Sequence, residues 1–473
     1  MLIKPRMRPF IELSILTRYH LTYLPRRASV STVKLRLHSS FHFHFASTLL
    51  SPTQDTHSLI QYTPIEDTES IDKYRPGGYH PLQIGDRFGS HSQYRVVHIL
   101  GFGGHSTTWL AWDEFQGRHV SLKIAIASDI ASSQEIHTLR RLRESVCDTA
   151  GRKRFPFPIV LDSFTHNGPN GTHECLVTEP DMCSLAKSKS TSKGVWYFDL
   201  AVARTITAQL IRATVMLHSR GIVHGDIHPG NILFTLPSSF HALSTKDIYA
   251  TYREPIKEPV QRRDGVSQLP TNVPPYVVPP VWLGKRYEHI TTADANIMIT
   301  DFGEAWFPAA SPRYSLNTPV LYRPPEAVFA ESEGKPISFA ADIWSLGCTI
   351  YELFAPGTLF EGFFPDEDDM VAEMVSALGK PPRSWWEGWQ ARGDFFDAEG
   401  ENWNVKKGRI SDGDYYTFDA RVDCIKQDRK GVVEQEELDD LRLLLGSMIR
   451  WSPEERFSAD MLMVSEWMRK WGA

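Results

Sequence analysis

The sequence predicts an α+β protein in which a small antiparallel β-sheet with one key helix precedes a larger helical part. Three observations support this fold class. Residues 94–126 are rich in β-branched and aromatic residues and are interrupted by Gly-rich turns, which is typical of consecutive strands. Ile136, Leu139 and Leu142 then recur at three-residue steps, as on one face of a helix. Farther along, helical spacing dominates, most clearly in a segment that stops at Gly221.

Length and charge set broad limits on function. The chain has 473 residues, which is enough for one large domain or two ordinary ones with a well-buried core. Its formal net charge of −6 is unevenly divided, because residues 1–50 carry +7 and the remainder therefore carries −13. An acidic body argues against nucleic acid as a direct partner and favours basic partners.

Cysteine usage and hydropathy exclude two further classes. The five cysteines are scattered and form no C-x-x-C pair, so neither a disulfide framework nor a zinc site is predicted, and a reducing compartment fits best. No apolar run reaches the roughly 18 residues that span a bilayer, so we expect no membrane segment.

The chain divides into three parts. We expect residues 1–73 to be a basic, disordered tail or a targeting segment, because residues 1–50 have the Arg- and Ser-rich, acid-poor composition of a mitochondrial transit peptide. A wrongly assigned gene start would give the same composition. Residues 74–181 should form the β-rich part and residues 182–473 the helical part. Within the latter, residues 235–293 contain eight prolines and should cross the surface as an extended, partly polyproline connector without a helix.

A Gly-rich turn, LGFGGHSTTW, connects two of the predicted strands. Gly101 and Gly103 allow backbone N–H groups to approach phosphate oxygens closely, and Ser106 follows in the same turn. Such a turn alone is weak evidence for nucleotide binding, because β-proteins often contain Gly-rich turns.

A lysine and a glutamate form the second candidate pair. Lys123 ends the apolar strand VSLK, and Glu135 follows at the start of the predicted helix. A buried ammonium needs a carboxylate partner, and a paired lysine can hold nucleotide phosphates as a positioned charge. The alternative is two surface charges that never meet, but the neighbouring motifs favour the pair.

Three polar residues complete the candidate site. Asp226 and Asn231 stand five apart in IVHGDIHPGNILF, and Asp301 follows an apolar strand in ITDFGEAW. A carboxylate such as Asp226 can accept the proton of an attacking hydroxyl, while Asn231 and Asp301 offer the oxygen ligands that magnesium prefers.

In content and order these motifs resemble those of protein kinases, over about residues 80–470. The resemblance implies a two-lobed protein kinase fold, ATP and Mg²⁺ as cofactors, and transfer of the γ-phosphate to serine or threonine. RPPE ending at Glu326 resembles the end of an activation segment, Asp342 a buried brace of the catalytic loop, and Arg456 the late arginine that pairs with that glutamate.

The resemblance also implies catalytic roles for Lys123 and Glu135. It implies a set of ATP-binding positions that, besides Gly101, Gly103, Ser106 and Lys123, comprises Leu100, Thr108, Ser121, Thr178, Glu179 and Asp181.

Within the kinases, the sequence is similar to the SR-protein kinase family, which phosphorylates serines in Arg-Ser-rich splicing factors. YRPGGYHPLQIGDRF at 74–88, TTWLAWD after Ser106, the long insert after Asn231 and the segment MVSALGKPP carry this likeness. It implies a basic Arg-Ser-rich protein substrate, a role in regulating mRNA splicing, a monomer without direct nucleic-acid or membrane contact, and location in cytoplasm and nucleus. A mitochondrial location depends on the N-terminal tail alone.

The catalytic loop departs from the kinase pattern at two positions. His228 replaces a lysine that neutralises the transferred phosphoryl group, and since an imidazole is only partly charged at neutral pH, slower chemistry is expected. Gly225 replaces an arginine that in many kinases pairs with a phosphorylated activation loop. Phosphorylation at Ser311, Ser315 or Thr318 would find no cation there, so we expect activity that does not require it.

Other departures concern nucleotide and substrate binding. Thr108, Ser121 and the gatekeeper Thr178 place hydroxyls where apolar packing around adenine is usual, so ATP affinity is expected to be modest. Thr318 lies one residue too early for the usual threonine before Tyr322, which leaves the substrate-facing loop undefined by sequence.

Two acidic runs and a tryptophan cluster permit more than one interpretation. PDEDDM at 365–370 and EQEELDD at 434–440 could attract an Arg-rich peptide, or could be ordinary solvated helix faces. Trp385, Trp386 and Trp389 are expected to be local core.

Two alternative functions are considered. HGDIHPGN resembles the loop of small-molecule kinases of the aminoglycoside or choline type, but those enzymes lack RPPE, ADIWSLGC and the late arginine. The other alternative is a weakly active pseudokinase scaffold. The sequence argues against it, because a scaffold need not keep the four key polar residues and all four are retained. These are Lys123, Asp226, Asn231 and Asp301.

Overall fold

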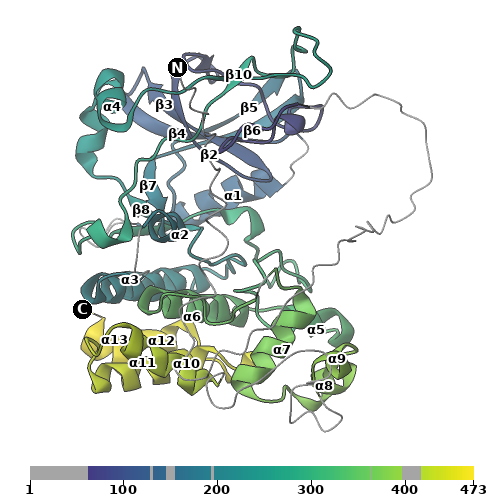
Figure 1. The fold of residues 1–473 in the computed structure, drawn as a ribbon, viewed down its shortest axis with the longest axis vertical. Coiled ribbons are helices and arrows are strands. Elements are labelled where there is room, and N and C mark those ends of the chain that lie inside the picture. Colours follow the sequence, from purple (N-terminus) through teal and green to yellow (C-terminus); the bar gives the residue numbers. More distant parts are fainter. Residues whose placement is uncertain are drawn as a thin grey trace, which may run out of the picture. The chain divides into compact units, whose positions relative to one another are not determined.

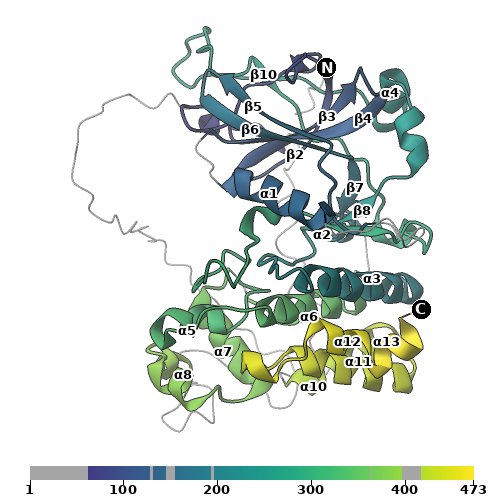
Figure 2. The ribbon, with the colours of Figure 1, turned by 180° about the vertical axis from the view of Figure 1, so that it is seen from behind.

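The computed structural model describes residues 62–127, 131–144, 155–192, 197–362, 364–396 and 417–472. They form two lobes, a β-rich N-lobe and a helical C-lobe, which are seen from opposite sides in Figures 1 and 2. This confirms the predicted α+β, two-lobed fold. The expected tail lies largely outside the described residues, which begin at Tyr62.

The N-lobe is an antiparallel six-stranded sheet with the order β1-β2-β3-β4-β6-β5. Val120, Leu122 and Ile124 alternate along β4 with side chains of the other face, and all three are buried in the sheet's own apolar cluster. The predicted apolar face of helix α1, with Ile136, Leu139 and Leu142, lies in the cluster that contains Leu176 of β6 and continues into the C-lobe core. The elements are β1 (Arg87–Phe88), β2 (Tyr94–Phe102), β3 (Ser106–Asp113), β4 (Arg118–Ala125), α1 (Ala131–Glu144), β5 (Asp162–Gly168) and β6 (Gly171–Thr178).

A small second sheet follows the six-stranded sheet along the chain and carries the catalytic loop. Its strands β7 (Asp181–Ser184), β8 (Ile232–Thr235) and β11 (Ile297–Ile299) have the order β11-β8-β7. The loop between α3 and β8 and the turn after β11 therefore leave this sheet side by side, which is how residues 226 and 301 come near each other.

Helices α3 (Leu200–His218) and α6 (Ala340–Phe354) form the centre of the C-lobe. Asp199 caps the start of α3, and Gly221 takes a left-handed φ of 71° just after its end. By length and composition α3 could cross a membrane, which the sequence reading had not anticipated. Most of its apolar residues are instead buried in the C-lobe core, as expected for the central helix of a folded lobe.

The remaining helices cover this centre. Trp385 and Trp389 are buried, and Trp385 stacks on Phe329 of α5, so the prediction that the tryptophans are local core is confirmed. The helices are α2 (Leu185–Ser190), α5 (Glu326–Glu333), α7 (Glu367–Leu378), α8 (Arg383–Gly388), α9 (Arg392–Phe395), α10 (Phe418–Asp428), α11 (Gln435–Met448), α12 (Ala459–Met463) and α13 (Glu466–Trp471).

The insert at 235–293 differs from its prediction. It contains helix α4 (Thr245–Tyr252), which begins at a capping box formed by Ser244 and Asp247. Ile248 of α4 is fully buried in a cluster with Val97 and Leu110 of the N-lobe sheet, so this burial stabilises a helix that the many prolines had argued against. Figures 1 and 2 both show α4 beside the sheet, far from the C-lobe helices.

The rest of the insert is extended, as predicted, but it also packs on the N-lobe. Strands β9 (Glu258–Pro259) and β10 (Tyr276–Val277) pair with each other, and Val260 and Val277 join a buried cluster with Tyr62, Tyr74 and Tyr79. The N-lobe boundary at residue 74 is therefore too late, because Tyr62 and Ile71 are already part of this core. Apolar side chains in a short stretch outside the strands gave no periodic signal that could have shown this.

Candidate active site

Lys123 is held between two carboxylates. Its Nζ lies 2.7 Å from Oε2 of Glu135 on α1 and 3.1 Å from Oδ1 of Asp301, which follows β11. Burial lowers the pKa of Lys123, but the attraction of Glu135 and then of Asp301 outweighs it, so the net effect raises that pKa. Lys123 in turn lowers the pKa of the Asp301 carboxyl. Lys123 is therefore a fixed cation between β4, α1 and the loop that carries Asp301.

The expected nucleotide-binding residues gather at one end of the sheet. Thr108 faces Gly101 on β2 and Lys123 on β4, and Ser121 faces Thr178 across β4 and β6. The Thr178 hydroxyl donates to the carbonyl of Glu179 at 3.3 Å, so it has a local partner. Leu100, Gly103 and Ser106 lie in β2, in β3 and in the turn between them. Asp181 begins β7 of the small second sheet.

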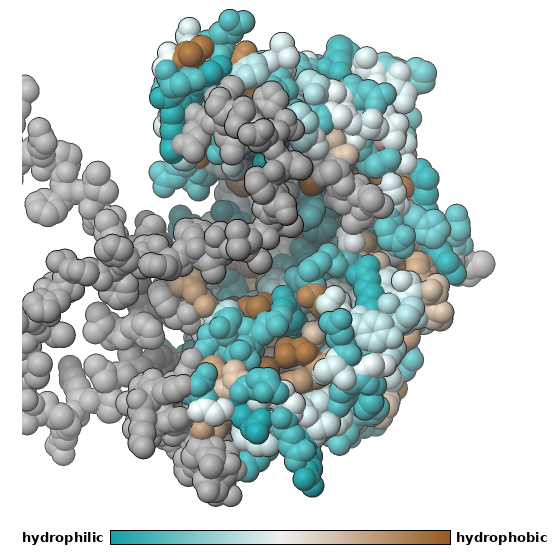
Figure 3. All heavy atoms as spheres, turned by 90° about the vertical axis from the view of Figure 1, so that its right-hand side faces the viewer, coloured by the Kyte–Doolittle hydropathy of each residue, from teal (hydrophilic) through white to brown (hydrophobic). Residues whose placement is uncertain are grey.

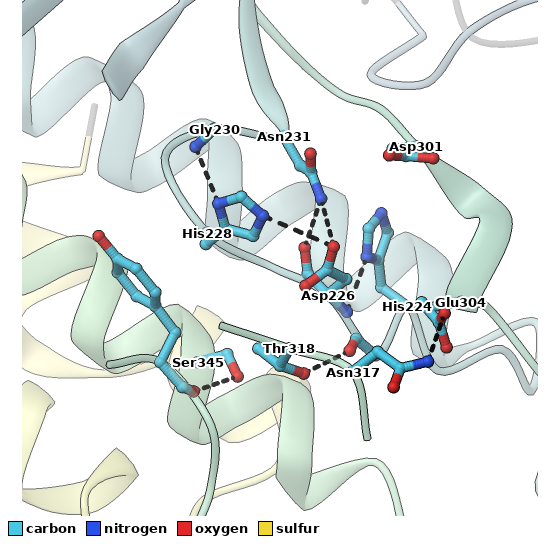
Figure 4. A network of polar contacts seen from close by, with 12 residues as sticks. His224, Asp226, His228, Gly230, Asn231, Asp301, Glu304, Asn317, Thr318 and Ser345 are labelled. Carbon is cyan, nitrogen blue, oxygen red and sulfur yellow. Dashed lines mark hydrogen bonds and ion pairs between the residues drawn. The ribbon is translucent and has the colours of Figure 1, made fainter. Parts of the chain in front are cut away.

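The catalytic loop holds Asp226 through Asn231. The Asn231 Nδ2 donates to the backbone carbonyl of Asp226 at 3.0 Å and to its Oδ2 at 2.7 Å (Figure 4). The other carboxylate oxygen, Oδ1, is buried and has no hydrogen-bond partner among the described residues. A buried, unpaired carboxylate oxygen is costly unless a substrate hydroxyl or an ion satisfies it.

Asp342 fixes the same loop from below. Its Oδ2 accepts from the backbone N–H of His224 at 2.8 Å, and its Oδ1 accepts from that of Gly225 at 2.9 Å. His218 of α3 lies 3.0 Å from the same carboxylate. The predicted brace is therefore present, and it fixes the backbone on the N-terminal side of Asp226.

His224 links the catalytic loop, which contains Asp226, to the loop that contains Asp301. Its Nδ1 accepts from the N–H of Asp226 at 3.2 Å, and its Nε2 donates to the carbonyl of Thr300 at 3.1 Å. Its ring packs edge-on against Phe302, 4.8 Å between centroids. His224 thus connects the backbone of Asp226 with the backbone that precedes Asp301.

Gly225 is required by its surroundings. Its φ is +76°, and a Cβ at this position would lie 2.6 Å from Cζ3 of Trp306. Trp306 thus excludes an arginine at position 225, and the absence of that arginine is a packing feature of the loop. Sequence reasoning had identified the missing cation but not the tryptophan that excludes it.

His228 points at the catalytic carboxylate. Its Nδ1 accepts from the N–H of Gly230 at 3.1 Å, which leaves the proton of a neutral imidazole on Nε2, and this atom lies 3.5 Å from Oδ2 of Asp226 (Figure 4). His228 therefore presents an N–H donor where a lysine would present an ammonium.

The donor set fits a divalent metal ion. Because the Asn231 Nδ2 is engaged by Asp226, its Oδ1 is the atom left to bind a cation. The Asp301 side chain is 53% exposed, and its left-handed backbone, with φ of 63°, turns it away from β11. One amide oxygen and one carboxylate on adjacent loops are suitable hard ligands.

The activation segment is held by its own contacts. Arg313 donates to Glu304 at 3.2 Å and stacks over Trp306, and Asn317 donates to Glu304 at 2.9 Å. Thr318, fully buried, donates to the carbonyl of Gly225 at 2.6 Å. Thr318 is therefore not available for phosphorylation in this state. This tether was missed because its offset from Tyr322 did not match the kinase pattern.

The predicted late ion pair is buried and bidentate. Arg456 donates to both carboxylate oxygens of Glu326, at 2.8 and 2.7 Å. It joins the end of the activation segment to the C-lobe core, as the motif implied.

The two acidic runs have different environments. In EQEELDD, Glu437 is buried and pairs with Arg204, and Asp440 pairs with Lys470, whereas Glu434, Glu436 and Asp439 are exposed. The run at 365–370 forms the start of α7, where Glu367 pairs with Arg323. A small pocket there has a mostly apolar lining that includes Val320 and Met370, with Arg323 and Glu367 as its charged residues. Figure 3 shows a mostly hydrophilic face with small apolar patches on the C-lobe.

Comparisons with known proteins agree with this site. The model of the protein kinase domain matches residues 288–468. A serine/threonine protein kinase of Aspergillus fumigatus is 26% identical over 408 residues, covering 85% of this chain and 90% of the relative. The serine/threonine-protein kinase SRPK of Physarum polycephalum is 28% identical over 414 residues, covering 83% and 89%. The human SRSF protein kinase 3 is 34% identical over 181 residues, covering 37% and 31%.

Two features define the class of ATP- and metal-dependent protein kinases. One is a β-rich lobe that contains a lysine–glutamate pair, and the other is a loop that holds an aspartate and an asparagine. The chain is a serine/threonine protein kinase whose sequence is similar to SR-protein kinases.

Proposed function

We propose that this kinase transfers the γ-phosphate of ATP, with Mg²⁺, to serine or threonine in basic, Arg-Ser-rich protein segments of the splicing-factor type. The observation that carries the substrate class is the acidic first turn of α7, which lies next to Arg323 near the end of the activation segment. The names of the Physarum and human relatives point to the same class.

The chain's own residues supply positioning and charge for this transfer. Oδ1 of Asp226 has no partner among the described residues and can accept a hydrogen bond, then the proton, from the attacking hydroxyl. Lys123 would hold the nucleotide phosphates as a fixed cation. Asn231 and Asp301 would hold Mg²⁺, which neutralises phosphate charge when bound. His228 would donate its Nε2 proton toward the transferred group as a hydrogen bond.

We propose that this chemistry is independent of activation-loop phosphorylation. Glu304, Arg313 and Asn317 already fix the segment, and Trp306 occupies the space that an arginine at 225 would need. Ser311→Ala and Ser315→Ala variants should therefore keep turnover within about twofold of wild type, since exposed polar substitutions change little. A wild-type enzyme that is silent until treated with an activating kinase would refute this.

The decisive assay uses labelled ATP, Mg²⁺, an Arg-Ser repeat peptide and a panel of small alcohols. Transfer to the peptide, abolished in Asp226→Asn, would support the proposal. Transfer only to a small alcohol would favour the small-molecule kinase. No transfer to any acceptor, with the variant equally silent, would favour the scaffold.

Charge variants of the two acidic runs test the substrate class. Glu367→Gln on α7 should raise the peptide KM several-fold at low salt and less at high salt, because screening weakens the attraction. The matched control is Glu436→Gln on α11, an exposed acid that is likewise paired, with Lys470, but lies far along the chain from the activation segment, and this variant should leave the peptide KM unchanged. Equal effects of both variants would contradict a docking role for α7.

We also propose a cytoplasmic and nuclear location, with the mitochondrion as the alternative if residues 1–50 act as a transit peptide. Fluorescence microscopy of the tagged full chain and of a chain lacking residues 1–50 tests this. Mitochondrial signal that is lost on truncation would favour the alternative.

A further inference from the structure

The tip of the Gly-rich loop is fastened to the segment that precedes the N-lobe sheet. The Tyr79 hydroxyl donates to the carbonyl of Gly103, and the Lys73 Nζ lies 3.3 Å from the carbonyl of Gly104. The same ammonium donates to the Tyr79 hydroxyl at 3.3 Å. One hydroxyl and one ammonium therefore hold two consecutive carbonyls of the loop expected to cover the nucleotide phosphates.

We propose that Tyr79 and Lys73 are positioning residues for nucleotide binding, which hold the Gly-rich loop in the shape that receives the phosphates of ATP. The inference rests on the proposed function, because it assigns a role within that same nucleotide site. Neither residue lies in a motif that carries the kinase chemistry.

The Tyr79 side chain is suited to this role. It is 2% exposed, and its ring packs edge-on against Tyr74 with 5.6 Å between centroids, so the hydroxyl has a fixed place. Burial raises the pKa of Tyr79 to about 12, and the hydroxyl therefore stays protonated as a donor at physiological pH.

The backbone of Tyr79 is itself held by the insert. Asn170, in the turn between β5 and β6, donates from Nδ2 to the Tyr79 carbonyl at 2.6 Å and to the Asn272 carbonyl at 3.0 Å. Asn272 of the insert donates to the carbonyl of Tyr74 at 3.2 Å. A continuous set of hydrogen bonds thus runs from the insert to the Gly-rich loop, and residues 272 and 103 are coupled through it.

The physical effect is preorganisation. Gly101, Gly103 and Gly104 have no atom near the position of a Cβ, so the loop's own side chains do not restrain it. An unrestrained Gly-rich loop loses more conformational entropy when it closes over phosphates, and this loss weakens binding. Because the two carbonyls are already held in the free enzyme, the loop loses less conformational entropy when ATP binds.

The test compares Tyr79→Phe with Tyr74→Phe in the full-length kinase. Tyr79→Phe keeps the ring and removes only the hydroxyl, and should raise the ATP KM by about fivefold, as expected for one lost hydrogen bond, with kcat changed less than the KM. Tyr74→Phe removes the 2.5 Å hydrogen bond to Glu69 in the same buried cluster and does not touch the loop. It should lower the melting temperature and leave the ATP KM unchanged.

Lys73 supplies a second, independent comparison. Lys73→Met should raise the ATP KM, and Lys73→Arg, which keeps a cationic donor, should restore it. Equal changes in ATP KM for Tyr79→Phe and Tyr74→Phe, or no change for Tyr79→Phe and Lys73→Met, would overturn the inference. A wild-type protein that binds no ATP by calorimetry would instead overturn the proposed function itself.

Discussion

Four carboxylates around the catalytic loop fall into two pairs with opposite environments. Asp342 and Glu326 are buried, and both oxygens of each accept hydrogen bonds at 2.7 to 2.9 Å. Asp226 keeps one buried oxygen without a partner among the described residues, and Asp301 is half exposed and shares only one oxygen with Lys123. The first pair stabilises the fold, and the second keeps oxygens available for substrate and metal.

This contrast teaches that satisfied and unsatisfied carboxylates of one site have different tasks. A fully paired buried carboxylate contributes to stability only while its partner remains. An unpaired one costs stability and is retained where a ligand completes it. The following substitutions separate the two tasks.

The largest effect is expected for Asp226→Asn. Loss of the proton acceptor should lower kcat at least about 100-fold, as expected for removal of a general base. Stability should be unchanged or slightly higher, because the carboxylate whose buried Oδ1 has no partner among the described residues loses its charge. Single-turnover assays and thermal melting measure the two quantities. A variant that loses activity because it unfolds would break the contrast.

Arg456→Met should show the opposite result. It leaves the buried Glu326 carboxylate without its cation, so the free energy of unfolding should fall by about 3–5 kcal/mol. Urea denaturation measures this loss. The matched control is Arg383→Met, whose pair with Glu387 is exposed to solvent, so its loss should leave the free energy of unfolding nearly unchanged. Similar losses in the two variants would contradict the structural role of the buried pair.

Two histidines also differ in whether their ring nitrogens have a partner. His80 is buried, and its Nδ1 lacks a partner among the described residues, whereas His228 directs a donor at Asp226. Burial, with His166 and His173 nearby, lowers the pKa of His80 to about 3. Between pH 6.5 and 3 the unfolded chain binds a proton that the folded chain does not, so stability should fall as the pH falls, by about 1.4 kcal/mol per pH unit.

Urea titrations between pH 7 and 5 test this slope. His80→Gln should reduce the slope by about one proton, which is the contribution of a single histidine. His91→Gln, at an exposed position, is the control and should leave the slope unchanged. An unaltered slope in His80→Gln would show that the histidine does not remain neutral in the folded protein.

The smallest effect is expected for His228→Lys. A lysine would place a permanent cation where His228 offers an imidazole N–H donor, so kcat should rise several-fold with little change in melting temperature. Unchanged turnover would mean that the Nε2 donor already suffices for phosphoryl transfer.

Much of this molecule could be predicted from local sequence. The strands, the helix around Leu139, the long helix ending at Gly221 and the buried tryptophans follow from apolar spacing and propensity, which act over a few residues. The Lys123–Glu135 pair and the Arg456–Glu326 pair came from motifs. By contrast, α4 was missed because burial of Ile248 against the N-lobe outweighed the prolines around it.

The sequence by itself determined the chemical groups of the site and their order, because each motif places its residues on one short turn or strand. The tertiary structure decided which groups meet. Trp306 excludes a side chain at Gly225, Thr318 reaches the catalytic loop across 93 residues, and Asn272 connects to the Gly-rich loop. These contacts join segments far apart in the chain, and their energies depend on burial and exact distance, which spacing along a sequence does not encode.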